Sequence, residues 1–140
     1  KLNGCLLMID YGYLKSNNQS TLQSVIKNKK NKVLQNLGKA DITSHVNFSL
    51  LKEFFLKNKC KVKKIISQKE FLIKMGIYNR AEIIAKKMKF RDQTNLYLRL
   101  TRLLSPRLMG ELFKVILVYK CKNTNYFGFN WCFTQEIWKK

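Results

Sequence analysis

The chain has 140 residues, of which 46% are hydrophobic, and its 28 basic and 8 acidic residues give a formal charge of +20. This apolar content excludes an intrinsically disordered chain, because it is enough to form a packed core. The sequence also has no apolar run that approaches the roughly 20 residues a membrane-spanning helix needs, so we expect no such helix. The four cysteines form no C-x-x-C pair and there is one histidine, so we expect free thiols and no metal site.

The basic excess has two interpretations. It could attract nucleic acid or another acidic partner. However, 23 of the 28 basic residues are lysines and 5 are arginines, a bias that an AT-rich coding sequence produces whatever the function. Specific nucleic-acid surfaces favour arginine, whose planar fork reads bases in bidentate fashion. We therefore do not expect nucleic acid as the main partner, and we keep a basic nucleic-acid-binding module as an alternative.

The first predicted element is a strand at residues 5–9, which reads CLLMI. A continuous apolar run of this length is typical of a parallel-sheet strand that is covered on both faces. Residues 20–23, Ser-Thr-Leu-Gln, have the form of a capping box and predict a helix start, with apolar residues 22, 25 and 26 on one face. Residues 27–32 are rich in lysine and asparagine and predict a solvated loop, and residues 38–43 predict a turn or loop.

The next predicted helix starts near Val46 or Asn47 and ends at Asn58, and a strand is predicted over residues 60–67. Three apolar stripes between Gln68 and Leu104 predict helices. Gly76 stops the first of them, and the Ser-Pro pair at 105–106 stops the last. Residues 113–119, FKVILVY, predict a strong strand. No structure is predicted for the tail, residues 121–140.

The predicted order is β-α-β-α-α-α-β, which belongs to an open α/β sheet. Ligands of such sheets bind in the crevice at the carboxyl ends of the strands. The first strand ends at Asp10 and Tyr11, so these two residues are the first candidates for chemistry.

Several segments together resemble the MidA-like methyltransferases, a family that includes the mitochondrial protein arginine methyltransferase that assists assembly of respiratory complex I. The resemblance covers residues 1–120. The segments read KLNGCLLMIDYG (1–12), TLQS (21–24), GKADITSHVNF (38–48), FLIKMGIYNRAE (71–82) and MGELFKVILVYK (109–120). This chain departs from the family at Ser20 and Asn47, where the family usually has aspartate. Serine and asparagine cap a helix as well as aspartate does, but if the carboxylate at position 47 serves catalysis, this copy is weakened.

The resemblance implies the C-terminal portion of a class I, Rossmann-like methyltransferase sheet of seven strands. The strands at 5–9, 62–66 and 113–119 would be the fifth, the sixth and an antiparallel seventh, with an inserted helical segment before the last. Residues 1–120 would be this part of the methyltransferase domain. The cofactor implied is S-adenosylmethionine, and its glycine-rich loop would lie upstream, since no G-x-G occurs in the chain.

The candidate site residues combine strand-end position and resemblance. Asp10, Tyr11 and His45 are the expected catalytic residues. Asp10 and Tyr11 end a strand at the crevice, and the His45 imidazole, with the Asp41 carboxylate in the same loop, could orient a nucleophile or take its proton. Asp41, Thr43 and Gln68 are the expected substrate-binding residues; a carboxylate pairs well with a guanidinium. Each also has a structural interpretation, as a helix cap, a turn residue or the start of a helix.

The function expected of the intact protein is S-adenosylmethionine-dependent methylation, with a protein arginine as substrate and a subunit of respiratory complex I as a possible partner. The expected compartment is the bacterial cytoplasm or the mitochondrial matrix. A fragment without the cofactor loop is expected to be inactive. Two alternatives stay open: a non-catalytic assembly scaffold and the basic nucleic-acid-binding module.

Overall fold

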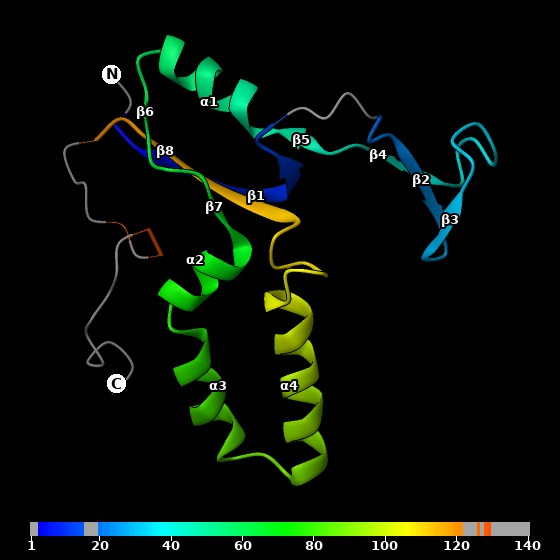
Figure 1. Cartoon of the computed structure of the whole chain (residues 1–140), viewed down its shortest axis with the longest axis vertical. Helices are drawn as coiled ribbons and strands as arrows, with labels where there is room; N and C mark the ends of the chain where they lie inside the picture. The colour runs from blue at the N-terminus through cyan, green and yellow to red at the C-terminus, as the bar shows by residue number, and fades with distance from the viewer. Residues whose placement is uncertain (1–2, 16–19, 122–125, 127, 130–140) are drawn as a thin grey trace.

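The computed structural model describes residues 3–15, 20–121, 126, 128 and 129 (Figure 1). The long strand β1 (Cys5–Tyr13) pairs antiparallel with β8 (Phe113–Tyr119) from Cys5↔Tyr119 to Tyr11↔Phe113. β8 also pairs antiparallel with β6 (Lys61–Val62) and β7 (Ile66–Ser67) on its other edge. The predicted antiparallel last strand therefore lies between the other two. The predicted strand over residues 60–67 is split into two short strands, but both add to the same edge.

Helices cover this sheet on both faces. Phe48, at the start of α1 (Phe48–Lys57), is fully buried against Ile116 and Val118. The adjacent Val115 points to the opposite face, where it packs with its strand partner Ile66 of β7 and with Phe71 of α2 (Gln68–Lys74). The mixed α/β fold is thus confirmed.

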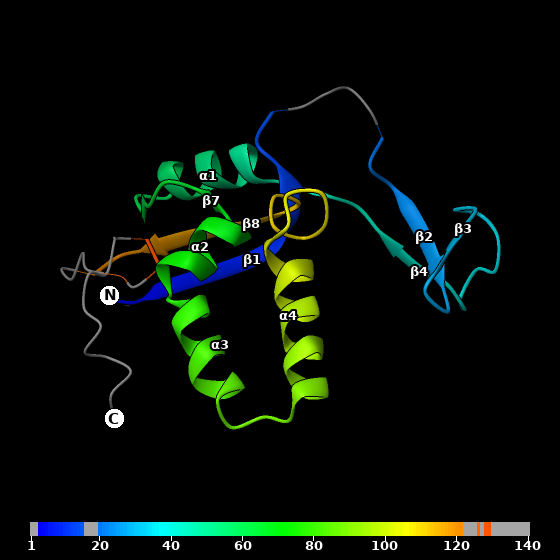
Figure 2. The same ribbon diagram turned by 60° about the horizontal axis from the view of Figure 1, so that its bottom comes forward.

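Local signals in the sequence position these helices. Asn47 caps α1 by accepting a hydrogen bond from the Leu50 N–H at 3.1 Å, as predicted for this position. Gly76, at φ 75°, ends α2 and starts α3 (Ile77–Ala85), and α4 (Phe90–Leu104) stops before Ser105. The inserted helical segment therefore forms as expected, with α2, α3 and α4 close together below the sheet in Figures 1 and 2.

The predicted helix at residues 20–26 is wrong. This stretch forms β2 (Gln23–Ile26), which pairs antiparallel with β3 (Lys29–Asn31) and β4 (Asp41–Thr43). We call residues 23–43 the arm. Lys27 and Asn28 adopt φ of 48° and 62°, the positive values of a two-residue hairpin turn, and the adjoining β-branched residues favour a strand. The Ser20 hydroxyl accepts only a distant 3.4 Å bond from the Leu22 N–H instead of forming a capping box.

The arm extends away from the rest of the described chain in both views (Figures 1 and 2). It leaves the sheet after β1 and returns through His45 to the two-residue strand β5 (Val46–Asn47). β5 pairs parallel with Gly12 and Tyr13 at the carboxyl end of β1. The arm is therefore attached to the sheet where the candidate chemistry was expected.

The first strand is not covered on both faces by the described residues. Leu6, Leu7 and Ile9 are each 46% exposed. Within the described ranges, residues 5–11 of β1 have a strand partner on one edge only, which is β8. The strand is apolar as predicted. However, the described residues do not bury its exposed face and provide no strand along its second edge at residues 5–11.

Beyond the end of β8, the Cys121 sulfur lies 2.7 Å from the Tyr126 hydroxyl. This hydrogen bond, together with desolvation and the neighbouring thiols, raises the pKa of Tyr126 from 10.0 to about 12. The folded state thus favours the protonated phenol. The stability that this raised pKa contributes is complete below pH 10.0, the pKa of the phenol in the unfolded chain, and is lost as the pH rises through about 12.

We expect the phenolate absorbance that Tyr126→Phe removes to develop near pH 12 in the unmodified chain. An ultraviolet difference titration of the two proteins measures this. Cys121→Ala should lower the midpoint towards 10.0, because it removes the main cause of the shift. A Tyr126 midpoint near 10.0 in the unmodified chain would contradict the contact.

Candidate functional site

Two of the three predicted catalytic residues lie together. The rings of Tyr11 and His45 meet edge to face, with centroids 5.5 Å apart. Phe113, directly opposite Tyr11 on β8, also packs edge to face with its ring, with centroids 5.6 Å apart. Tyr11 thus packs against both an imidazole and a phenyl ring at the carboxyl end of β1, and both Tyr11 and His45 remain partly accessible.

The position of His45 depends on a residue that the sequence analysis did not select. The backbone N–H of His45 donates a 3.1 Å hydrogen bond to the Thr21 hydroxyl, which lies just before β2. This bond joins the two residues that flank the arm, beside Tyr11. Thr21 belongs to the TLQS segment, whose interpretation as part of a helix start concealed this role.

Asp10 does not share a face of the sheet with Tyr11. Successive side chains of a strand point to opposite faces, and Asp10 is paired with Lys114, which faces the α1 side. One Asp10 carboxylate oxygen accepts a 2.8 Å bond from the Tyr11 N–H. The structure therefore places Asp10 next to the Tyr11–His45 pair in the chain without directing its carboxylate at their rings.

The three predicted substrate-binding residues are not brought together. Asp41 and Thr43 lie on β4 of the arm, paired with Val25 and Gln23. Gln68 follows β7 at the same end of the sheet as Asp10, but it is buried and its side-chain amide donates to the Leu103 carbonyl at 3.0 Å. That bond ties α2 to α4, so the geometry gives Gln68 a structural partner.

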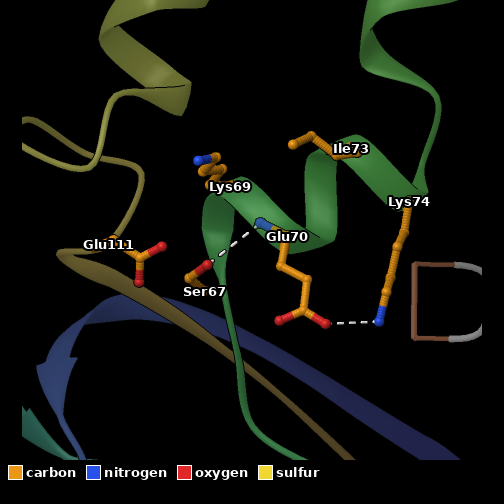
Figure 3. A pocket seen from close by; sticks show the side chains of 6 residues that line it. All are labelled: Ser67, Lys69, Glu70, Ile73, Lys74 and Glu111. Carbon is orange, nitrogen blue, oxygen red and sulfur yellow. Dashed lines mark hydrogen bonds and ion pairs between the residues drawn. The ribbon is translucent and has the colours of Figure 1, made fainter.

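A pocket of about 280 Å³ lies at the start of α2 (Figure 3). Its lining residues are Ser67, Lys69, Glu70, Ile73, Lys74 and Glu111. Ser67 caps α2 through the Glu70 N–H, and Lys74 forms a 2.7 Å ion pair with Glu70. The pocket contains none of the predicted catalytic residues, so we place the candidate site at the open Tyr11–His45 surface instead.

The described residues contain no group of three or more His, Cys, Asp or Glu side chains that could hold a metal ion. No helix in the described ranges is long and apolar enough to cross a membrane. The Tyr11–His45 surface can donate and accept hydrogen bonds, and its imidazole can act as a general base.

Part of the chain, including the Tyr11–His45 surface, is similar to a known protein family. Residues 2–66, which include β1, the arm, β5 and α1, match the family model described as "Putative S-adenosyl-L-methionine-dependent methyltransferase". The comparisons support a family of S-adenosylmethionine-dependent methyltransferases. No curated protein matches the chain.

Two crystal structures of proteins from one superfamily, both from Burkholderia thailandensis, are similar to the chain. One is an uncharacterized protein, with a TM-score of 0.73 and 25% identity over 91% of this chain. The other is bound to S-adenosyl-homocysteine, with a TM-score of 0.71 and 26% identity over 91% of this chain. The chain spans 34% and 33% of their lengths, about a third of each.

The residues of this chain do not by themselves form a site for such a cofactor. The sequence has no G-x-G segment, the usual cradle for a nucleotide at a strand-to-helix turn. What the chain does provide is a strand end with an adjoining aromatic and imidazole surface. We therefore assign it no nucleotide-binding residues.

Proposed function

We propose that the chain is the substrate-side part of an S-adenosylmethionine-dependent methyltransferase, and that a protein side chain is its substrate. The packing of Tyr11 against His45 at the carboxyl end of β1 carries the proposal. The family match over residues 2–66 and the relative bound to S-adenosyl-homocysteine support the cofactor. In its finer form, the proposal is that the methyl acceptor is an arginine and that the substrate is a subunit of respiratory complex I. This finer form rests on the resemblance alone.

S-adenosylmethionine supplies an activated methyl group, so the protein needs only to position the acceptor and remove its proton. His45 would take that proton. Thr21 would hold the His45 backbone in place, and Tyr11 would orient the imidazole by edge-to-face packing. Asp10, held by its bond to the Tyr11 N–H, would fix the end of β1.

We expect His45→Gln, in a form of the protein extended upstream, to lower methyl transfer about 10²–10⁴-fold, the usual contribution of a general base. Cofactor affinity should stay unchanged, because His45 lies on the acceptor side. Transfer of a radiolabelled methyl group to protein measures the first, and calorimetry the second. Tyr78→Phe is the matched control, since Tyr78 is an exposed tyrosine on α3. Full activity in His45→Gln would exclude His45 as the base.

A scaffold that keeps the fold without chemistry is the second candidate. It is favoured by the predicted site residues that do not converge on the Tyr11–His45 surface, since the Asp10 and Gln68 side chains are hydrogen-bonded within the fold. The two candidates differ in one measurement. A folded, upstream-extended protein that binds a partner protein but transfers no methyl group from S-adenosylmethionine would support the scaffold.

A further inference from the structure

The loop at residues 32–40, at the far end of the arm, is held in one conformation by side-chain hydrogen bonds. The Asn31 amide donates to the Ser24 hydroxyl at 3.1 Å and to the Gln35 carbonyl at 2.7 Å. Asn36 in turn donates to the Asn31 side-chain oxygen at 3.2 Å. These bonds fold the loop over Ser24, which is only 1% exposed. The loop is therefore built around a polar centre.

This loop presents apolar side chains to solvent. Leu34 is 83% exposed and Leu37 is 67% exposed, and Ile42 on β4 is 52% exposed. Burying a leucine side chain stabilises a fold or a complex by about 1.5–3 kcal/mol. The two exposed leucines of this loop could therefore contribute this free energy to the binding of a partner. Exposed apolar side chains on an ordered loop are candidates for a binding surface.

The charge around the leucines indicates the kind of partner. The arm carries one carboxylate, Asp41, and five exposed lysines. These lysines are Lys27, Lys29, Lys30, Lys32 and Lys39. None of them forms an ion pair with another residue in the described part of the chain. A segment with carboxylates and apolar side chains complements both features, because it would neutralise the lysines and cover the leucines.

The arm is also attached at the candidate site. The residues that flank it, Thr21 and His45, are joined by the bond between the His45 N–H and the Thr21 hydroxyl, beside the Tyr11 ring. A polypeptide bound along the arm would therefore lead towards Tyr11 and His45. We propose that the arm docks an acidic, apolar segment of the protein substrate, with Leu34 and Leu37 as its apolar contacts. This role as a substrate-docking surface rests on the proposed function.

The test uses the whole chain and a labelled peptide of alternating glutamate and leucine, with fluorescence anisotropy as the readout. Leu34→Ser and Leu37→Ser together should weaken binding about tenfold or more, equivalent to 1.4 kcal/mol. They should not affect a glutamate–serine peptide of equal charge. Charge reversal of Lys29, Lys30 and Lys32 should weaken binding of both peptides, because it removes the electrostatic attraction.

Matched variants elsewhere serve as controls. Phe90→Ser with Leu98→Ser on α4 removes apolar side chains of similar exposure, 84% and 63%. Charge reversal of Lys86, Lys87 and Lys89 controls for the overall charge. Equal losses in arm and control variants would overturn the proposal. So would a leucine dependence found only with vesicles of phosphatidylcholine and phosphatidylserine, since it would indicate a membrane as the partner.

Cofactor binding separates this proposal from the function on which it rests. Arm variants of the upstream-extended protein should keep their affinity for S-adenosylmethionine while losing affinity for the glutamate–leucine peptide. An extended protein that binds the peptide through the arm but not the cofactor would overturn the proposed function and leave the docking surface. Cofactor binding without arm-dependent peptide binding would overturn the docking surface alone.

Discussion

Isothermal titration calorimetry should detect S-adenosylmethionine binding by the upstream-extended protein and none by the 140-residue chain. Enzymes commonly bind their substrates with constants of about 1 μM to 1 mM, and we expect the extended protein to fall within that range. Any residual binding by the chain alone should be at least about 100-fold weaker and escape detection, because the chain has no G-x-G segment, and each 1.4 kcal/mol of lost contact is tenfold in affinity.

The physical reason lies in β1. Its outer edge has no strand partner at residues 5–11 within the described ranges, and Leu6, Leu7 and Ile9 are 46% exposed. An unpaired apolar edge of this kind promotes association between copies. We therefore expect the chain alone to show concentration-dependent light scattering that the extended protein does not show.

Each calorimetric outcome has a definite meaning. Binding by both proteins with equal affinity would locate the cofactor pocket within these 140 residues and contradict our assignment. Binding by neither, with the extended protein shown to be folded by its cooperative melting, would overturn the methyltransferase and favour the scaffold. S-adenosyl-homocysteine serves as the control ligand, because it is the molecule bound in the similar Burkholderia thailandensis structure.

The elements that the sequence predicted well have strong local causes. The Asn47 cap, the Gly76 stop and the branched apolar run of β8 act within a few residues, and the structure has each where it was expected. The arm was missed because its cause is different. Residues 23–26 fit a short amphipathic helix as well as a strand. The two-residue turn at Lys27 and Asn28 favours the strand over the helix, and its positive φ values cannot be read from the sequence.

The candidate site was predictable to a similar extent. The rule that ligands bind at the carboxyl ends of strands selected Tyr11, and the resemblance selected His45, and their rings do meet. The opposite orientations of Asp10 and Tyr11 follow from the alternation of a strand. They could have been anticipated if β1 had been extended beyond Ile9. The role of Thr21 could not have been anticipated, because its hydrogen bond to His45 depends on the path by which the chain returns from the arm to the sheet.

Gly12→Ala should destabilise the folded chain by about 1–3 kcal/mol, the usual cost of overpacking a filled interior. A Cβ at this position would lie 2.3 Å from the Val46 carbonyl oxygen and 2.7 Å from the Phe48 ring. Neither can move easily, because Val46 is paired with Gly12 across β5 and β1, and Phe48 is fully buried. Gly12 therefore allows β1 and β5 to approach under α1.

Urea unfolding followed by circular dichroism measures this loss, and Gly4→Ala is its control. A Cβ at Gly4 meets nothing within 4 Å, so that substitution should change the free energy of unfolding by less than about 0.5 kcal/mol. Equal stabilities of the two variants would contradict the close packing of β5 on β1. Because Val46 follows His45 directly, the Gly12 substitution should also displace the imidazole from Tyr11. In the extended protein it should therefore lower methyl transfer more than the loss of stability alone explains.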